Sequence, residues 1–227
     1  MGELDMNYNE IGIKKLQEGK MEEALQAFGK AIDENPEDAL GFINFGHILT
    51  EVNDIESAER AFQKAITLDE TSATAYYGLA NLYFNAERFT EAAKIYEKAI
   101  HHGLEGGDAH LMLARCFNRM DQHKLALPYY QRAVEINDND EQAHLEFGIA
   151  LATLELFELA QPQLEKAVEL MPESSDGHYN LGVLYAVSTD RTEDALHHLK
   201  KAYTLDENNF MARDVYNMVA SGLENGQ

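Results

Sequence analysis

The stretch GFINFGHILTEVNDIESAERAFQKAITL, residues 41–68, decides the fold of this chain. Apolar residues in its first half recur three and four positions apart, at Phe42, Phe45, Ile48, Leu49 and Val52. This is the spacing of one helix face, and the second half repeats it. Between the halves stands Asn53-Asp54, and the Asp54 carboxylate is placed to cap the second helix. The stretch therefore predicts two antiparallel helices joined by a short turn.

The same unit recurs along the sequence with a period of 34 residues. Three columns of small residues keep this spacing: Gly12, Gly46, Ala80, Ala114, Gly148 and Gly182; Ala24, Ala58, Ala92, Ala126 and Ala160; and Ala31, Ala65, Ala99, Ala133 and Ala167. A fixed period in this range indicates a repeat array. Two short helices cannot bury their apolar faces alone, so neighbouring units must stack. We expect the column of Gly46 to let the paired helices approach closely.

The pattern Ala-x3-Phe-x2-Ala followed by proline, as at Ala24, Phe28, Ala31 and Pro36, resembles the tetratricopeptide repeat (TPR) family when it recurs at this period. The chain departs from the family pattern because it has no Trp and because its sixth unit is one residue longer. The resemblance implies an all-α, right-handed superhelical solenoid of helix–turn–helix repeats, as in a small bacterial-type protein made only of TPRs.

The implied organisation is a single TPR array over residues 1–227. Its repeats are expected at about 5–38, 39–72, 73–106, 107–140, 141–174 and 175–209, with a capping helix at 210–223. A terminal helix of this kind keeps an array from exposing its apolar end. We expect four of its apolar residues to cover the sixth repeat: Met211, Val215, Met218 and Val219.

The charge of the chain excludes several classes of partner. There are 18 Lys and Arg against 40 Asp and Glu, a net charge of −22. Such an acidic surface repels phosphate backbones and anionic lipids, so we expect neither nucleic acid nor membrane as a partner. The sequence has no apolar run long enough to span a bilayer and no signal-peptide pattern at its start. We expect a cytoplasmic protein.

Catalytic, cofactor and metal motifs are absent from the sequence, so we expect no enzyme and no cofactor. His110, His144 and His178 are 34 residues apart in a column that elsewhere holds aromatic residues, and we interpret them as core side chains rather than metal ligands. The single cysteine, Cys116, lies within a first-helix pattern and is expected to pack as a small hydrophobe. Pro128 and Pro162 share one repeat position near the start of second helices, and if those helices begin about four residues before each proline, the missing N–H costs little.

The resemblance also implies a ligand site, because first helices of TPR arrays line a concave surface that binds extended peptides. Carried over by register, the predicted groove consists of Ile43, His47, Tyr77, Asn81, Phe84, Asn85, Leu111, Arg115, Asn118, Arg119, Leu145 and Ile149. Its two ends are more apolar than its centre, at Ile43 and at Leu145, Ile149, Val183 and Val187. Arg115 and Arg119, four residues apart on an acidic protein, favour an acidic ligand group. The alternative is internal pairing, with Glu146 on the next first helix as the obvious partner.

We therefore predict a non-catalytic scaffold that binds a protein or peptide segment in its groove, with apolar anchors and a carboxylate at Arg115 and Arg119. The chain itself is expected to be a monomer or a weak homo-oligomer. Two alternatives stay open: a structural array that associates with itself through its end helices, and the regulatory TPR arm of a larger enzyme or complex.

Overall fold

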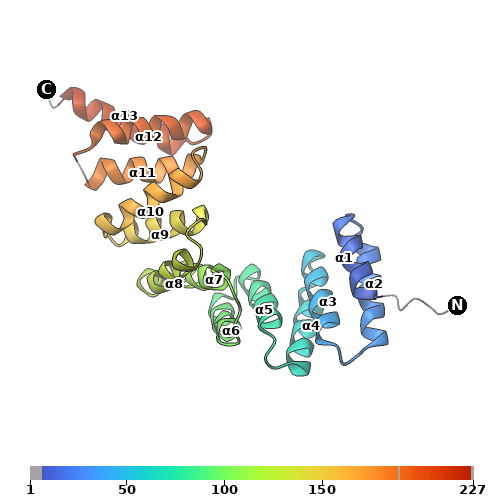
Figure 1. Ribbon diagram of the computed structural model, residues 1–227. Helices are drawn as coiled ribbons and strands as arrows, with labels where there is room; N and C mark the ends of the chain where they lie inside the picture. The colour runs from blue at the N-terminus through green and yellow to red at the C-terminus, as the bar shows by residue number, and fades with distance from the viewer. Residues whose placement is uncertain (1–6, 189, 226–227) are drawn as a thin grey trace. The chain divides into compact units, whose positions relative to one another are not determined.

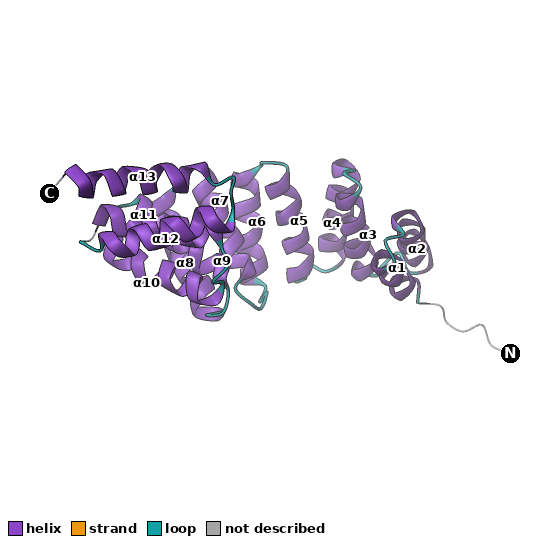
Figure 2. Cartoon of the chain, turned by 90° about the horizontal axis from the view of Figure 1, so that it is seen from above, coloured by secondary structure: helices purple, strands orange, loops and turns teal. Residues whose placement is uncertain are grey.

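The computed structural model describes residues 7–188 and 190–225, and within these ranges every regular element is a helix (Figure 1). The helices are α1 (Tyr8–Gln17), α2 (Met21–Glu34), α3 (Ala39–Glu51), α4 (Ile55–Leu68), α5 (Ala73–Asn85), α6 (Phe89–His101), α7 (Asp108–Arg119), α8 (His123–Ile136), α9 (Glu141–Thr153), α10 (Phe157–Leu170), α11 (Ser175–Ser188), α12 (Thr192–Leu205) and α13 (Phe210–Asn225). The all-α fold predicted from the sequence is confirmed, and Figure 2 shows the same elements from above.

The helices pair within each 34-residue segment, and neighbouring pairs inside one compact unit of the chain contact each other. In the first of two compact units, which ends at Glu105, α1 packs on α2, α3 on α4 and α5 on α6. In the second unit, which begins at Gly106, α7 packs on α8, α9 on α10 and α11 on α12, and α13 packs on α12. Contacts of α2 with α3, of α4 with α5, of α8 with α9 and of α10 with α11 stack the pairs.

The small columns lie where the paired helices touch, as predicted. A Cβ added to Gly46 would come within 2.9 Å of the Phe62 ring, and one added to Gly148 would come within 2.6 Å of Leu164. Real Cβ atoms do not approach other atoms so closely. The absence of a side chain at these positions therefore sets the distance between the two helices of a repeat.

The turn inside each of the first five repeats uses a left-handed residue that the sequence pattern did not reveal. Asn53, Glu87, Asp121 and Glu155 have φ of 61°, 58°, 58° and 59°, and Gly19 stands at the equivalent place with φ 73°. After α9, the N–H of Glu155 donates to the carbonyl of Ala152, and the N–H of Leu156 donates to that of Leu151. These are the two bonds of a Schellman motif, which satisfies the last carbonyls of the helix.

The two helical prolines lie deeper than predicted. α8 begins at His123 and α10 at Phe157, so Pro128 and Pro162 are the sixth residues of their helices. At this depth each proline removes a bond that the helix would otherwise make, rather than an orphan N–H. The carbonyls left without that donor belong to Lys124 and Glu158, which are exposed and reach water.

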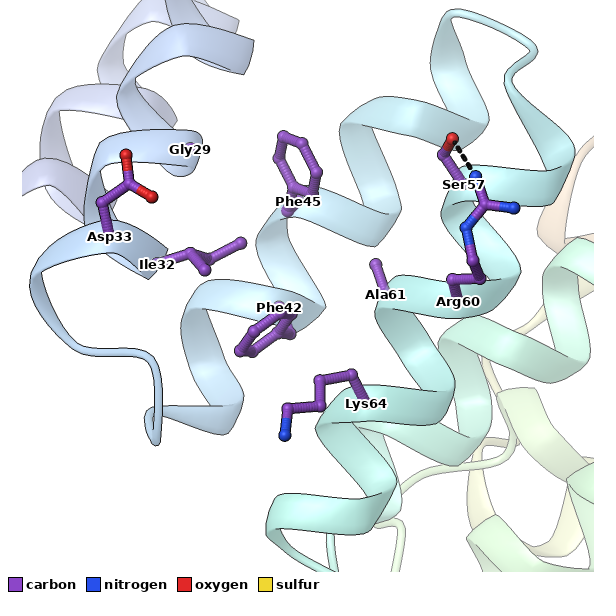
Figure 3. A pocket seen from close by; sticks show the side chains of 9 residues that line it. All are labelled: Gly29, Ile32, Asp33, Phe42, Phe45, Ser57, Arg60, Ala61 and Lys64. Atoms are coloured by element: carbon purple, nitrogen blue, oxygen red, sulfur yellow. Dashed lines mark hydrogen bonds between the residues drawn. The ribbon is translucent and has the colours of Figure 1, made fainter.

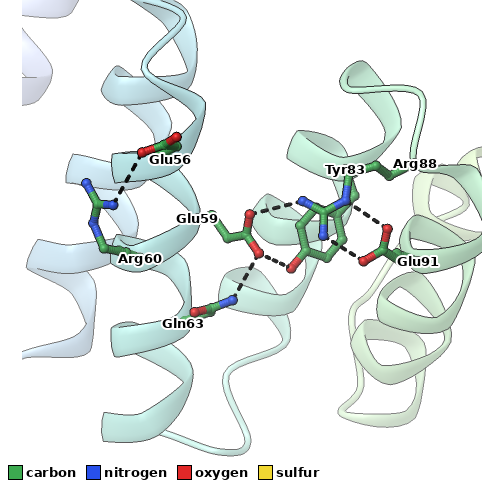
Figure 4. Close-up of polar contacts among 7 residues, drawn as sticks. All are labelled: Glu56, Glu59, Arg60, Gln63, Tyr83, Arg88 and Glu91. Carbon is green, nitrogen blue, oxygen red and sulfur yellow. Dashed lines mark hydrogen bonds and ion pairs between the residues drawn. The ribbon is translucent and has the colours of Figure 1, made fainter.

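A polar cluster ties one repeat to the next in the first unit (Figure 4). Glu59 of α4 accepts hydrogen bonds from the Tyr83 hydroxyl at 2.7 Å and from the Arg88 guanidinium at 3.0 Å. Arg88 stacks over the Tyr83 ring at 4.0 Å and also binds Glu91 of α6 at 2.6 Å. Gln63, one turn after Glu59, has its side chain directed into the same cluster.

The second unit repeats this cluster with one exchange. Glu165 of α10 accepts from the Tyr185 hydroxyl at 2.6 Å, and Arg191 lies 4.2 Å over the Tyr185 ring and binds Asp194 at 2.7 Å. Tyr185 follows Tyr83 by three periods, but Glu165 stands where the first cluster has Gln63. The acidic residue thus stands at one of two positions that lie one helical turn apart. In both clusters its carboxylate accepts a hydrogen bond from the tyrosine hydroxyl of the next first helix.

The terminal helix α13 packs with a face different from the predicted one. Ala212 is fully buried and Tyr216 contacts Tyr203 of α12 edge-on, whereas Met211 and Met218 are 65% and 73% exposed. The prediction that both methionines cover the sixth repeat is therefore wrong. The register explains this, because Ala212 and Tyr216 take the first-helix positions of Gly177 and Leu181, which face the preceding second helix.

Candidate functional site: the first-helix faces

In the first unit, the predicted groove residues lie on α3 and α5 and are only partly available to a ligand. Ile43 is buried, with 5% of its surface exposed, so it belongs to the core. His47 is exposed and contacts the Phe62 ring edge-on, with the ring centroids 5.1 Å apart. Tyr77 lies partly exposed against Tyr96.

The other predicted residues of the first unit lie further along α5. Asn81 accepts a hydrogen bond from the buried Tyr96 hydroxyl at 2.6 Å, which occupies the side-chain oxygen that was expected to hold a peptide backbone. Phe84 packs edge-on against Phe89, and Asn85 is exposed. This face therefore presents mixed polar and aromatic side chains.

In the second unit, Arg115 of α7 pairs with Glu146 of α9. Its Nε lies 3.1 and 2.9 Å from the two carboxylate oxygens, and its Nη2 lies 2.7 Å from Oε1. Gln142 donates to the same carboxylate at 2.9 Å, and the Tyr130 hydroxyl reaches it at 3.4 Å. The hydrogen bonds that Arg115 donates to the Glu146 carboxylate raise the pKa of Arg115 above its usual value. Of the two possibilities that the sequence left open, the structure has internal pairing at Arg115.

The remaining predicted residues of the second unit differ in exposure. Leu111 and Leu145 are buried, with exposed fractions of 6% and 7%, and belong to the apolar core of the unit. Asn118 is partly buried and its side-chain oxygen is hydrogen-bonded to the His123 ring, while Arg119 is exposed. Ile149 is partly exposed and packs against the same core.

An apolar stripe on α9, α11 and α13 is the most open part of the first-helix face in this unit. It consists of Ile149, Val183, Val187 and Met218. Val187 is 63% exposed and Met218 is 73% exposed. Ile149 and Val183 share one repeat position, and Met218 continues it because α13 follows α11 by 35 residues. The three helices that carry these residues are neighbours, because α11 contacts both α9 and α13.

Sequence reasoning had identified Val183 and Val187 as an apolar end of the groove but missed Met218. The sequence does contain the information that places Met218 in this stripe, because the one-residue insertion in the sixth repeat shifts the register of α13 by one residue. Without that shift, Met218 was assigned to the buried face.

Of the three histidines predicted to be core side chains, His144 and His178 are buried and His110 is only partly buried, and Cys116 is buried as predicted. His144 is buried and binds the Gln163 side chain at 2.8 Å, and His178 is buried and binds the His198 ring at 2.7 Å. Cys116 is fully buried, and burial raises the pKa of its thiol to about 12. In residues 7–188 and 190–225, no group of three or more His, Cys, Asp or Glu side chains is arranged to hold a metal ion.

No helix in the described part of the chain combines the length and the apolar character needed to cross a membrane.

Stacked helix pairs with glycine or alanine at their contacts, repeating every 34 residues, define a helical-repeat protein of the TPR type. A family model for the Cilia and flagella-associated protein 70 C-terminal domain, a TPR domain, matches residues 8–184, and a tetratricopeptide repeat model matches residues 175–209. The chain belongs to the tetratricopeptide repeat family.

Known proteins agree with this assignment. A 40-residue segment is 52% identical to the TPR repeat-containing protein YrrB of Bacillus subtilis, and this alignment covers 18% of the chain and 19% of YrrB. The crystal structure of YrrB, described as a TPR protein with an unusual peptide-binding site, is similar with a TM-score of 0.75 and 42% identity, covering 85% of this chain and 99% of that one.

Two further structures share the fold. MamA is 25% identical with a TM-score of 0.65, over 72% of this chain and 95% of that one. PilF of Pseudomonas aeruginosa reaches a TM-score of 0.82 over 93% of this chain and 96% of its own, but at 17% identity it shows the fold alone.

Proposed function

We propose that this chain is a non-catalytic scaffold that binds an extended peptide or protein segment on its first-helix faces. The observation that carries the proposal is the apolar stripe, in which Val187 and Met218 are exposed and Ile149 and Val183 are partly exposed. Apolar side chains gathered on the face of stacked helices are costly to leave in water, and they are typical of surfaces that bind a partner. The family supports the same interpretation, since the solved structure of YrrB is described by its peptide-binding site.

The chemistry of the partner follows from the surface around the stripe. Arg115 already shares Glu146, so a partner carboxylate there would compete with an acid held at 2.7 Å on the neighbouring helix. The stripe, rather than the arginine pair, therefore supplies the principal contact. We expect a partner segment with aliphatic or aromatic side chains spaced to follow α9, α11 and α13.

The experiment is affinity capture from a cell lysate with a double variant, Val187→Glu and Met218→Glu. Both side chains are mostly exposed, so their replacement should change stability by less than about 0.5 kcal/mol each. Leu159→Glu on α10 is the matched control, because Leu159 is 58% exposed and lies on a second helix. The double variant should lose the captured proteins while the control keeps them. If the double variant retains the same proteins, the stripe does not bind them and the proposal is wrong.

A second candidate function, self-association through the terminal helix, is favoured by one observation. Phe210 and Met211 of α13 are 62% and 65% exposed at the end of the second unit. If this surface binds a second copy, sedimentation at micromolar concentration gives a dimer, and Met211→Glu returns the monomer. If the wild type is a monomer, self-association is contradicted, and partner binding alone explains the exposed surface.

A further inference from the structure

A hollow of about 610 Å³ lies in the first unit between α2 and α4, with α3 behind it (Figure 3). Phe42 and Phe45 of α3 form its floor, and Ile32 and Ala61 form its apolar walls. Pockets that bind compact ligands have volumes of about 300–1,000 Å³ and are lined mainly by apolar and aromatic side chains with a few polar groups. This hollow has the size and the lining of such a site.

The hollow exists because two side chains present in other repeats are missing here. Gly29 stands at a position that holds Gln63, Glu97, Gln131 and Glu165 in the following repeats. Ala61 stands at a position that becomes Ile95, Tyr129 and Gln163. A Cβ added to Gly29 would meet no atom within 4 Å, so the space beside it is open. Gly29 of the first repeat and Ala61 of the second are therefore smaller than the residues at the same positions of the following repeats, although the first repeat also has an alanine, Ala27, at the position of Ala61.

This hollow is separate from the first-helix face. With roughly 100° between successive residues of a helix, Phe42 and Phe45 point about 140° and 160° away from His47 on α3. The walls come from the second helices α2 and α4. A ligand here would leave the first-helix face free.

The charges at the rim favour an anionic ligand group. Arg60 and Lys64 lie one turn apart on the α4 wall, and Asp33 lies on the α2 wall. Arg60 is partly engaged, since it binds the Ser57 hydroxyl at 2.9 Å and lies 3.9 Å from Glu56. Lys64 is exposed, and among the residues that the structure describes no carboxylate lies within 4 Å of its ammonium group. On a protein of net charge −22, this is a local site for a carboxylate.

We propose that the hollow between α2 and α4 binds a segment of a partner protein that inserts one aromatic or leucine side chain against Phe42 and Phe45 and places an acidic side chain beside Lys64. The lining side chains come from α2 and α4 on either side of α3 (Figure 3). We take an internal acidic side chain, rather than a chain terminus, as the source of the carboxylate, and the probes below distinguish the two.

Capped dipeptides test both halves of this chemistry. The probe is acetyl-Asp-Phe-amide, titrated into the full chain labelled with nitrogen-15 while the backbone amide resonances are followed. Saturable shifts are expected at Gly29, Ile32, Phe42, Phe45 and Lys64. Acetyl-Asp-Ala-amide, which lacks the ring, should bind at least tenfold more weakly, because burial of the ring supplies most of the affinity.

The ion pair between the Asp side chain of the probe and Lys64 contributes less to the affinity than the ring does, because Lys64 is exposed. Acetyl-Asn-Phe-amide should bind two- to fivefold more weakly than the Asp probe, the range expected for an exposed ion pair. N-acetyl-phenylalanine, which carries its carboxylate at the chain end, should also bind more weakly. Tighter binding of N-acetyl-phenylalanine than of the Asp probe would contradict the internal-segment proposal.

Two variants with matched controls complete the test. Gly29→Gln introduces the residue of the next repeat into open space, so it should fold normally and abolish the shifts. Gly222→Gln, another helical glycine with nothing within 4 Å, should leave them unchanged. Lys64→Gln should remove the preference for Asp over Asn, whereas Lys98→Gln at the same position of the next repeat should keep it.

The proposal is overturned if the Asp probe gives no saturable shifts at the hollow, or if a folded Gly29→Gln variant binds it as the wild type does. Neither outcome bears on the first-helix stripe, which belongs to the other unit. Likewise, loss of partners by the Val187→Glu and Met218→Glu double variant would neither support nor contradict the proposal for the hollow.

Discussion

Gly148 shows at the scale of one residue why the small columns could be recognised from the sequence. A side chain there would enter the space filled by Leu164, and the same contact recurs between Gly182 and Leu199. Such a constraint repeats with the period, so it is visible in the sequence alone. Glu146 could also be named from the sequence as the internal partner of Arg115, but the sequence could not decide between this pair and a ligand, because the distance between side chains on α7 and α9 depends on how the helices stack.

The first prediction compares two identical substitutions. Gly148→Ala places a Cβ 2.6 Å from Leu164 and should destabilise the protein by about 1–3 kcal/mol through overpacking. Gly222→Ala on α13 meets nothing within 4 Å and should stabilise it by up to about 1 kcal/mol through helix propensity. Urea unfolding midpoints measure both. Equal midpoints for the two variants would mean that the helix contact at Gly148 is not tight.

The second prediction concerns the pair of His178 and His198, whose ring nitrogens are 2.7 Å apart. Burial and the neighbouring imidazole lower the pKa of His198 to about 4, and burial also lowers the pKa of His178. The charged groups that act on the pair are His197, Asp194, Lys201 and Glu173. Because the unfolded chain binds protons that the folded pair does not, this pair stabilises the fold above about pH 6.5 and loses its contribution between pH 6.5 and 4.

The test replaces His198 by Gln, the residue that the fifth repeat uses at Gln163 to bind His144. His198→Gln should melt at a temperature that depends less on pH between 6.5 and 4 than that of the wild type. Control melts of His197→Gln should follow the wild-type profile more closely, since His197 is exposed. Superimposable profiles for wild type and His198→Gln would show that the pair does not titrate with folding.

At the scale of elements, the helices were predictable from apolar periodicity, but their ends were not. The depth of Pro128 and Pro162 was misjudged because α8 and α10 begin one residue earlier than expected. The left-handed turn residues escaped because most of them are not glycine. The packing of α13 was misassigned because its register depends on the insertion before it, and Thr189 of that turn lies outside the described residues.

The third prediction uses one of these turns. Glu155 has φ of 59°, a conformation that costs an ordinary L-residue about 1–2 kcal/mol and costs glycine little. Glu155→Gly should therefore raise the free energy of unfolding by roughly 1 kcal/mol. The same change at Glu97, an exposed site inside α6, should lower it by roughly 0.5–1 kcal/mol. Denaturant unfolding measures the change in the free energy of unfolding for both variants. If Glu155→Gly is destabilising, the contacts of the Glu155 side chain contribute more to stability than its backbone conformation costs.

At the scale of the whole molecule, the repeat period predicted the architecture but not where the chain divides. Asn81 and Asn85 were expected to share a site with Arg115 and Arg119, and these pairs belong to different compact units. The 34-residue period continues unchanged through the boundary between the two units, so the period does not reveal where that boundary lies. The apolar stripe was partly predictable, because each of its residues stands in a column of the register.

The most direct measurement of partner binding is photocrosslinking from the stripe. A benzophenone amino acid placed at Val187, which is 63% exposed on α11, should form covalent adducts with a partner protein upon irradiation in cells. The same group at Leu159, 58% exposed on α10, should form few. Peptide mapping of the Val187 adducts should return one apolar segment of the partner. Equal adducts from both sites, or adducts only from Leu159, would contradict binding on the first-helix face.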